Sequence, residues 1–205
     1  MKTEHPILFS TDMVKAILEG RKTQTRRVNK LEGLDGDSPY YETREGDLVP
    51  INDMCPYGQV GDSLWVRETW GSLGWHQGDE IPIHKIGDDD VIYLQEIIEK
   101  CPDFQWMGDD EDIEYREDGR EKTHWKPSIF LPRKYSRITL EITEIRVQRL
   151  QEISPNDCRD EGVEPFLYTI NYRKLWDSIN GKKYPWESNP WVWAISFKVL
   201  VPNQR

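Results

Sequence analysis

Residues 20–27, GRKTQTRR, bring an amine, two hydroxyls and three guanidinium groups together in a short stretch. Lys22 and Thr25 are three residues apart, a spacing that lets an amine and a hydroxyl reach the same wall of a pocket. A hydroxyl attacks efficiently when a base takes its proton, and a lysine that is desolvated or flanked by cations has a lowered pKa and suits that task. A Thr-Lys hydrolytic pair is therefore chemically reasonable, but the spacing by itself does not decide for it. The alternative interpretation is a solvated basic loop whose side chains satisfy the last carbonyls of a preceding helix.

A helix is expected directly before this segment. Residues 10–19 carry apolar side chains at helical spacing, and Ser10 or Thr11 is a suitable N-cap. Gly20 can end the helix in the left-handed conformation. The basic segment therefore leaves the C-terminus of a helix.

Three later stretches have the pattern of strands. Gly61 and Asp62 predict a turn that runs into a strand through residues 64–66. Residues 138–147 alternate apolar side chains with one slip in phase, which predicts a β-bulge near Thr143. The last strand is expected over residues 191–201, which are apolar on both faces.

Two further helices are expected after the bulged strand. Ser154 is the expected N-cap of the first, Pro155 occupies its first position and Gly162 stops it. The second lies around residues 171–180 and ends at Gly181. Short, bulged and aromatic strands with a few helices favour an α+β fold on a small, partly closed β-barrel over a doubly wound sheet.

The length of 205 residues and the hydrophobic content of 37% predict a single domain, residues 1–205, with one core. Residues 31–57 and 71–122 look like insertions in that domain and are expected to be long loops or lids. The formal net charge of −10 arises almost entirely from residues 71–122. The rest of the chain is close to neutral, so a small anionic or polar ligand is favoured over a long polyanion, which needs a continuous basic surface.

Metals, cofactors and membranes are not expected. The cysteines, Cys55, Cys101 and Cys158, are widely spaced, the four histidines are scattered, and no glycine-rich phosphate loop is present. The cysteine usage predicts a reduced compartment. No apolar stretch approaches the length that crosses a bilayer, and the polar N-terminus has no signal-peptide pattern. The expected location is the cytoplasm.

Gly20, Lys22 and Arg27, in the order G-x-K-x-x-x-x-R after a short helix, resemble the signature of the ASCH (activating signal cointegrator homology) superfamily. In that family a Gly-Asp turn also leads into a central strand, and a long strand runs into a short helix bearing a glutamate. The closing segments LWDSINGK and NPWVWAISFKV resemble those of phage and prophage members. The resemblance implies a PUA-like small β-barrel with flanking helices, here with two long insertions.

The resemblance also implies an activity. The superfamily includes small amidohydrolases that remove the acetyl group from N4-acetylcytidine, and their lysine, threonine and glutamate look like a catalytic set. These positions fall on Lys22, Thr25 and Glu161, the last by alignment of the capped helix SPNDCRDEG. Many members carry a glutamate where Thr25 stands, so the threonine favours the hydrolase branch. Without the resemblance, Glu161 would be interpreted as a surface carboxylate at a helix end.

The implied substrate is an N4-acylated cytosine or cytidine. We expect neutral Lys22 to take the Thr25 proton, and Glu161 to protonate the departing amine. Backbone amides or the two arginines at the end of the basic segment are candidate donors to the oxyanion, and tryptophans near the cleft are candidate partners for the ring. The candidate substrate-binding residues are Arg21, Arg26, Arg27, Arg67, Glu68, Trp70 and Trp125.

Two other classes of function stay open. One is a non-catalytic PUA-like protein that binds RNA or a modified nucleobase, and the other is a phage-encoded interaction or morphogenesis protein. Residues 125–137 interleave basic and aromatic side chains, as single-stranded nucleic-acid sites do. They also fit a covering loop whose Pro127 and Pro132 hold an extended path. RNA is the less favoured partner because the chain is acidic.

Overall fold

The computed structural model describes residues 2–31, 34, 38, 40–76, 79–85, 125–163 and 166–200. The chain divides into two compact units. The first unit comprises residues 1–7, 16–66 and 137–205, and the second unit comprises residues 8–15 and 67–136. The three predicted catalytic residues all lie in the first unit.

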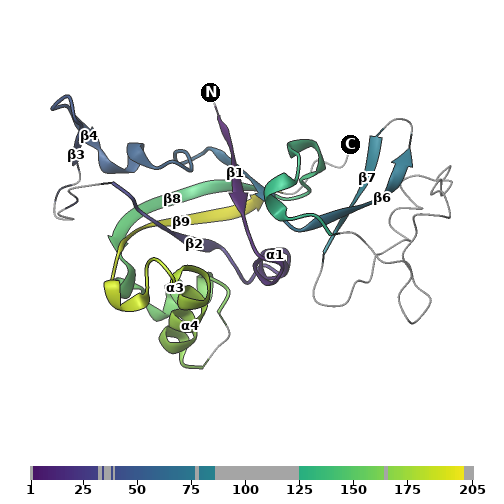
Figure 1. Cartoon of the computed structure of the whole chain (residues 1–205). Helices are drawn as coiled ribbons and strands as arrows, with labels where there is room; N and C mark the ends of the chain where they lie inside the picture. The colour runs from purple at the N-terminus through teal and green to yellow at the C-terminus, as the bar shows by residue number, and fades with distance from the viewer. Residues whose placement is uncertain are drawn as a thin grey trace. The chain divides into compact units, whose positions relative to one another are not determined.

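The first unit is built on a five-stranded sheet. Its strands, in spatial order, are β1 (Glu4–Leu8), β5 (Ser63–Arg67), β8 (Thr139–Arg149), β9 (Trp191–Leu200) and β2 (Gln24–Val28). The pairs β5–β8, β8–β9 and β9–β2 are antiparallel. The long strands β8 and β9 form a curved ribbon, and β2 is left as an edge strand beside β9 (Figure 1).

A β-bulge lies in β8 where the phase of the apolar residues slips. The register between β8 and β9 shifts between Ile142 and Glu144, which leaves Thr143 as the extra residue. Ile142 and Ile145 are three residues apart, so strict alternation would place them on opposite faces of the strand. The shift keeps both buried, at 0% and 4% exposure. The bulge predicted near Thr143 is therefore confirmed.

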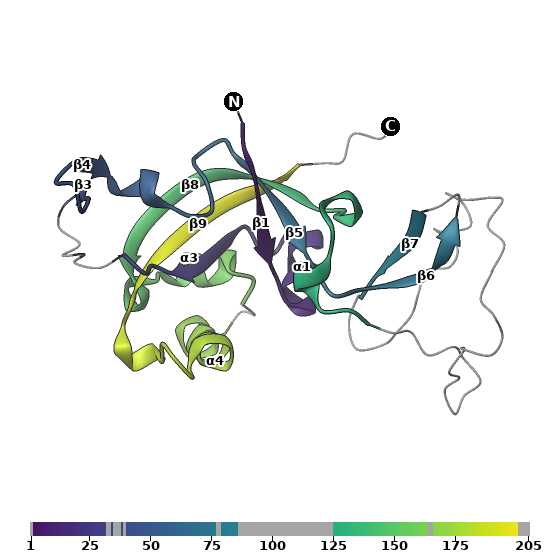
Figure 2. The same ribbon diagram turned by 45° about the horizontal axis from the view of Figure 1, so that its top comes forward.

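Two helices cover part of this sheet next to β2. Helix α3 (Pro155–Asp160) follows the single turn η4 (Leu150–Glu152) at the end of β8, and helix α4 (Tyr168–Asn180) comes after it. Both views show α3 and α4 side by side, with α3 close to β2 (Figures 1 and 2). The predicted cap at Ser154, the proline at the first position and the stop at Gly162 are confirmed.

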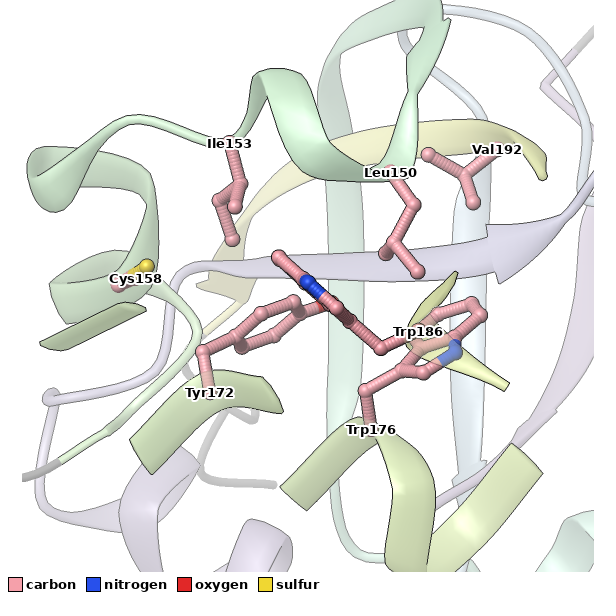
Figure 3. Close-up of a cluster of buried hydrophobic side chains, with 7 residues drawn as sticks. All are labelled: Leu150, Ile153, Cys158, Tyr172, Trp176, Trp186 and Val192. Carbon is pink, nitrogen blue, oxygen red and sulfur yellow. The ribbon is translucent and has the colours of Figure 1, made fainter. Parts of the chain in front are cut away.

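Apolar side chains anchor these helices to the sheet. Tyr172 and Trp176 of α4 point into a cluster that also receives Trp186 from the turn η5 (Trp186–Ser188) (Figure 3). The Trp176 indole nitrogen donates to the Tyr184 carbonyl at 2.8 Å, so its one polar atom is satisfied. Full burial of each such side chain contributes roughly 1.5–3 kcal/mol to folding. The cluster consists of Leu150, Ile153, Cys158, Tyr172, Trp176, Trp186 and Val192.

The second unit carries a hairpin of β6 (Trp70–His76) and β7 (Asp79–His84) and the single turns η2 (Ser128–Phe130) and η3 (Arg133–Tyr135). Helix α1 (Thr11–Leu18) begins within the second unit and ends in the first. Pro127 directly precedes η2, and Pro132, whose backbone is extended, directly precedes η3. None of the described helices is long and apolar enough to cross a membrane.

The α+β class is confirmed, and the two predicted insertions are partly corrected. Residues 40–54 form the hairpin of β3 (Tyr40–Glu42) and β4 (Leu48–Pro50) followed by η1 (Ile51–Met54), so the first insertion is not a plain loop. The second begins with the β6–β7 hairpin, and its residues 86–122 lie outside the described residues. Because β1 and β2 end the order of the described strands, a closed barrel stays a prediction.

Candidate active site

The basic segment after α1 runs into the edge strand β2, and most of its side chains from Lys22 onward are buried. Gly20 ends α1 with a φ of +72°, and β2 starts at Gln24. The Thr23 carbonyl accepts from the Phe197 amide at 2.8 Å, and the Thr23 amide donates to the Asp160 carbonyl at 2.7 Å. The sheet and α3 therefore hold this segment from both sides. The solvated-loop alternative is wrong because the side chains of Lys22, Gln24, Thr25 and Arg26 are buried.

The capped helix α3 places Glu161 opposite Lys22. Ser154 and Asp157 form a reciprocal capping box at its start, and Glu161 is the C-cap residue. Gly162 follows with a φ of +83°, which turns the chain away. An isolated antiparallel bridge then joins Lys22 and Glu161, residues 139 apart in the chain. The interpretation of Glu161 as a surface carboxylate is wrong, since only 4% of the residue is exposed.

Lys22 and Glu161 form a buried ion pair. The Lys22 Nζ atom lies 2.6 Å from Oε2 of Glu161, and the two side chains are 0% and 3% exposed. Nζ also donates to the Gln24 carbonyl at 2.8 Å and to the Glu161 carbonyl at 3.0 Å. Burial lowers the pKa of Lys22 below its usual 10.5, with Glu161 acting in the opposite direction. The short contact and the lowered pKa allow a proton to pass between the two groups.

Arg26 binds the other oxygen of the same carboxylate. Its Nη1 atom lies 3.2 Å from Oε1 of Glu161 and 2.5 Å from Oε1 of Gln24. Its Nη2 atom lies 3.3 Å from Oδ2 of Asp157, and its guanidinium carbon is 5.9 Å from the centre of the Tyr172 ring. The side chain is fully buried, so its charge is balanced by the two carboxylates and not by water.

Thr25 is buried but does not bond to Lys22. It is 3% exposed and pairs with Ile195 of β9. Side chains alternate along a strand, so Thr25 lies on the face of β2 opposite Gln24 and Arg26. None of the described hydrogen bonds joins the Thr25 hydroxyl to Nζ of Lys22, which bonds at the Gln24 carbonyl and Glu161. A Thr25-to-Lys22 proton transfer therefore requires Nζ to move away from Glu161.

The two other predicted arginines of the segment differ in burial. The Arg21 side chain is 42% exposed; it forms an ion pair with Glu19 and lies 3.4 Å from the Gly162 carbonyl. Arg27 is half-buried, and burial lowers the pKa of its guanidinium, while Tyr57 and Glu161 oppose that shift. The charge of Arg27 also lowers the pKa of Lys22.

The remaining four candidates, Arg67, Glu68, Trp70 and Trp125, lie in the second unit. Glu68 is 1% exposed, and its carboxylate lies 3.2 Å from Nδ1 of His84. The Lys126 amine lies 4.4 Å from the centre of the Trp70 ring, and the Tyr135 ring lies 5.7 Å away. Within the second unit, the buried Trp70 ring is therefore already in contact with a cation and with a tilted aromatic ring.

Sequence reasoning did not place Gln24, Asp157 or Tyr172 at the site. Asp157 belongs to the capping box of α3, and its carboxylate also pairs with Arg26 and Arg146. Burial and the Glu161 charge raise the pKa of Tyr172 well above 10, so its phenol stays protonated. Burial raises the pKa of Cys158 to about 11, which leaves no thiolate to compete as a nucleophile.

A cleft of about 360 Å³ runs beside the bridge between Lys22 and Glu161. Its walls include the sequence neighbours of both residues, among them Arg21, Thr23 and Gly162, together with Arg159 and Tyr168. This volume lies at the lower end of the range for small-molecule sites. Cations, hydroxyl groups and an aromatic ring at one cleft suit a polar, ring-containing ligand.

Gly162 is expected to be intolerant of a side chain. A Cβ atom there would lie 3.1 Å from Cβ of Lys22 and 3.2 Å from Cβ of Ala16, and the positive φ adds strain. We expect Gly162→Ala to lower the free energy of unfolding by about 2 kcal/mol, more than the cost of the left-handed conformation alone. Urea denaturation measures this. Gly20→Ala is the matched control. Gly20 also has a positive φ, +72°, but a Cβ atom added there would meet no atom within 4 Å. Equal losses in the two variants would contradict the expectation.

No family model and no curated protein matches this chain. Two solved structures match it. An ASCH domain from Lactobacillus crispatus JV V101 is 13% identical, over 96% of this chain and 79% of that chain, with a TM-score of 0.41. Protein EF3133 from Enterococcus faecalis V583, of the family model DUF984, is 9% identical, over 98% of this chain and 82% of that chain, with a TM-score of 0.41.

Proposed function

We propose that this chain is an amidohydrolase that removes the acyl group from N4-acylated cytosine or cytidine, with Lys22, Thr25 and Glu161 as its catalytic residues. The observation that carries the proposal is the buried contact of 2.6 Å between Lys22 and Glu161, which joins an amine of lowered pKa to a carboxylate. Perturbed, buried ionisable pairs are typical of catalytic sites. The cleft of about 360 Å³ has the volume of a small-molecule site; it is lined by sequence neighbours of Lys22 and Glu161 and by none of the three catalytic residues themselves.

The ion pair holds one proton that either partner can carry. Transfer from Nζ of Lys22 to Oε2 of Glu161 yields a neutral amine and a neutral carboxylic acid. Once Nζ has moved away from Glu161 to reach the Thr25 hydroxyl, the amine is the base for that hydroxyl, and the acid is a donor for the leaving group. Burial lowers the pKa of Lys22 and so favours release of its proton.

The acylation step balances with these groups. Oγ1 of Thr25 attacks the acyl carbon while its proton passes to Lys22, and the bond between the acyl carbon and N4 breaks as Glu161 protonates N4. The products are cytosine or cytidine, an acyl ester on Thr25, an ammonium on Lys22 and a carboxylate on Glu161. In deacylation, Glu161 takes a proton from the attacking water and Lys22 returns one to the Thr25 oxygen. The acid is released and the neutral pair is restored.

Hydrolysis of N4-acetylcytidine and N4-benzoylcytidine, followed by ultraviolet absorbance, tests the proposal. We expect the purified protein to release cytidine with a bell-shaped dependence of kcat on pH. Gain of a proton by the pair removes the base, and loss of its shared proton removes the acid. The alkaline limb is expected below pH 10.5, the usual pKa of lysine, because burial lowers the pKa of Lys22. A protein that binds these nucleosides or RNA without hydrolysing them is instead a non-catalytic binding protein.

A further inference from the structure

We propose that Arg26 is a positioning residue that holds the Glu161 carboxylate against Lys22, and that it does not contact the substrate. This inference rests on the proposed hydrolase. Sequence reasoning assigned Arg26 to the substrate or the oxyanion, and the geometry points to a different role.

The two terminal nitrogens of Arg26 contact three protein groups, and Nη1 makes the hydrogen bonds, whereas Nε and Nη2 make none among the described residues. Nη1 contacts Oε1 of Gln24 at 2.5 Å and Oε1 of Glu161 at 3.2 Å, and Nη2 contacts Asp157 at 3.3 Å. A planar guanidinium that spans several acceptors fixes their relative orientation, which an ammonium cannot do. The side chain is 0% exposed. An oxyanion donor needs to face the reacting carbonyl, whereas these contacts direct Arg26 into the protein.

Glu161 is therefore held through both of its oxygens. Oε2 faces Nζ of Lys22 and Oε1 faces Arg26. Without Arg26, the carboxylate loses one of two partners and gains freedom to rotate away from Lys22. Because a misplacement of about 1 Å can reduce a rate by about 10²-fold, this restraint matters for proton transfer within the pair.

Arg26 also contributes charge to the pair. The charged groups that act on Lys22 are Glu161, which raises its pKa, and Arg27 and Arg26, which lower it. Glu161 is also close to the protonated groups of Tyr172 and Cys158. Removal of the Arg26 charge is thus expected to raise the pKa of Lys22. A substitution that removes the planar guanidinium but keeps the positive charge is expected to change only the orientation of the Glu161 carboxylate.

The test compares Arg26→Met, which removes charge and fork, with Arg26→Lys, which keeps the charge. Steady-state kinetics with N4-acetylcytidine should show kcat reduced about 10²-fold in both variants, with KM changed by less than about threefold. The alkaline limb of kcat should move to higher pH in Arg26→Met and stay in place in Arg26→Lys. A ¹³C NMR titration of the Lys22 Cε signal should show the same pattern in the absence of substrate.

Arg146→Met is the matched control. Arg146 also pairs with Asp157, at 2.9 Å, but no described contact joins it to Glu161. Arg146→Met should lower the stability of the fold without moving the alkaline limb of kcat. The inference is overturned if Arg26→Met raises KM at an unchanged pH limb, which indicates substrate contact, or if both arginine variants only lower the melting temperature.

The two proposals fail separately. An active wild type whose Arg26 variants keep full kcat disproves the positioning role and leaves the hydrolase standing. An inert wild type disproves the hydrolase, and the NMR titration of Lys22 then decides whether Arg26 controls the pair. An unmoved Lys22 titration in Arg26→Met overturns the inference in that case too.

Discussion

Thr25→Val is expected to reduce the hydrolysis of N4-acetylcytidine by at least about 10³-fold, because it removes the proposed nucleophilic oxygen and keeps the shape of the side chain. Thr25 is 3% exposed and packs within β2 against β9, so a hydroxyl that makes no bond to Lys22 is replaceable by a methyl group at little cost. We expect the free energy of unfolding to change by no more than about 1 kcal/mol. Activity and urea denaturation are measured on the same preparation.

Two variants make this result specific. Thr25→Ser keeps a hydroxyl and should retain a substantial part of the activity, with an acyl-enzyme intermediate detectable by mass spectrometry. Thr143→Val alters an exposed threonine at the bulge of β8 that does not line the cleft, and it should leave kcat within about twofold. Full activity in Thr25→Val would exclude the covalent route and leave direct attack by water as the mechanism.

Lys22→Met and Glu161→Gln are each expected to abolish measurable hydrolysis and to destabilise the fold unequally. Glu161→Gln leaves two buried cations, Lys22 and Arg26, without their shared carboxylate, and is expected to cost about 3–5 kcal/mol. Lys22→Met leaves Glu161 paired with Arg26, so it should cost less. Loss of a general acid or base lowers rates by about 10²–10⁴-fold. Denaturation midpoints and initial rates of the two variants measure both effects.

The double variant Lys22→Met/Glu161→Gln separates stability from catalysis. Removal of both charges of the pair avoids the uncompensated lysine, so the double variant should be more stable than Glu161→Gln alone. It should remain inactive, because it has neither the base nor the acid. Losses of stability that simply add up would show that the contact of 2.6 Å contributes no interaction energy. Recovery of activity together with stability would contradict the catalytic role of the pair.

The local features of this fold were readable from the sequence because each depends on a few neighbouring residues. Gly20 and Gly162 end their helices with positive φ, and Ser154 caps α3, as their positions predicted. The bulge at Thr143 followed from a one-residue slip in the apolar alternation. The three-residue spacing raised Lys22 and Thr25 as a possible pair, whereas Glu161 joined them only through family resemblance and not from local pattern.

Tertiary structure decided what surrounds these residues. The sequence alone predicted a threonine, a lysine and a glutamate in one site, but spacing could not show that residues 24–28 form an edge strand of the sheet. That strand places Arg26 on the face of Glu161 and Thr25 on the opposite face. The burial that lowers the pKa of Lys22 also arises only when α3 closes over β2. Strand alternation and desolvation depend on pairing between segments more than a hundred residues apart, which no local pattern contains.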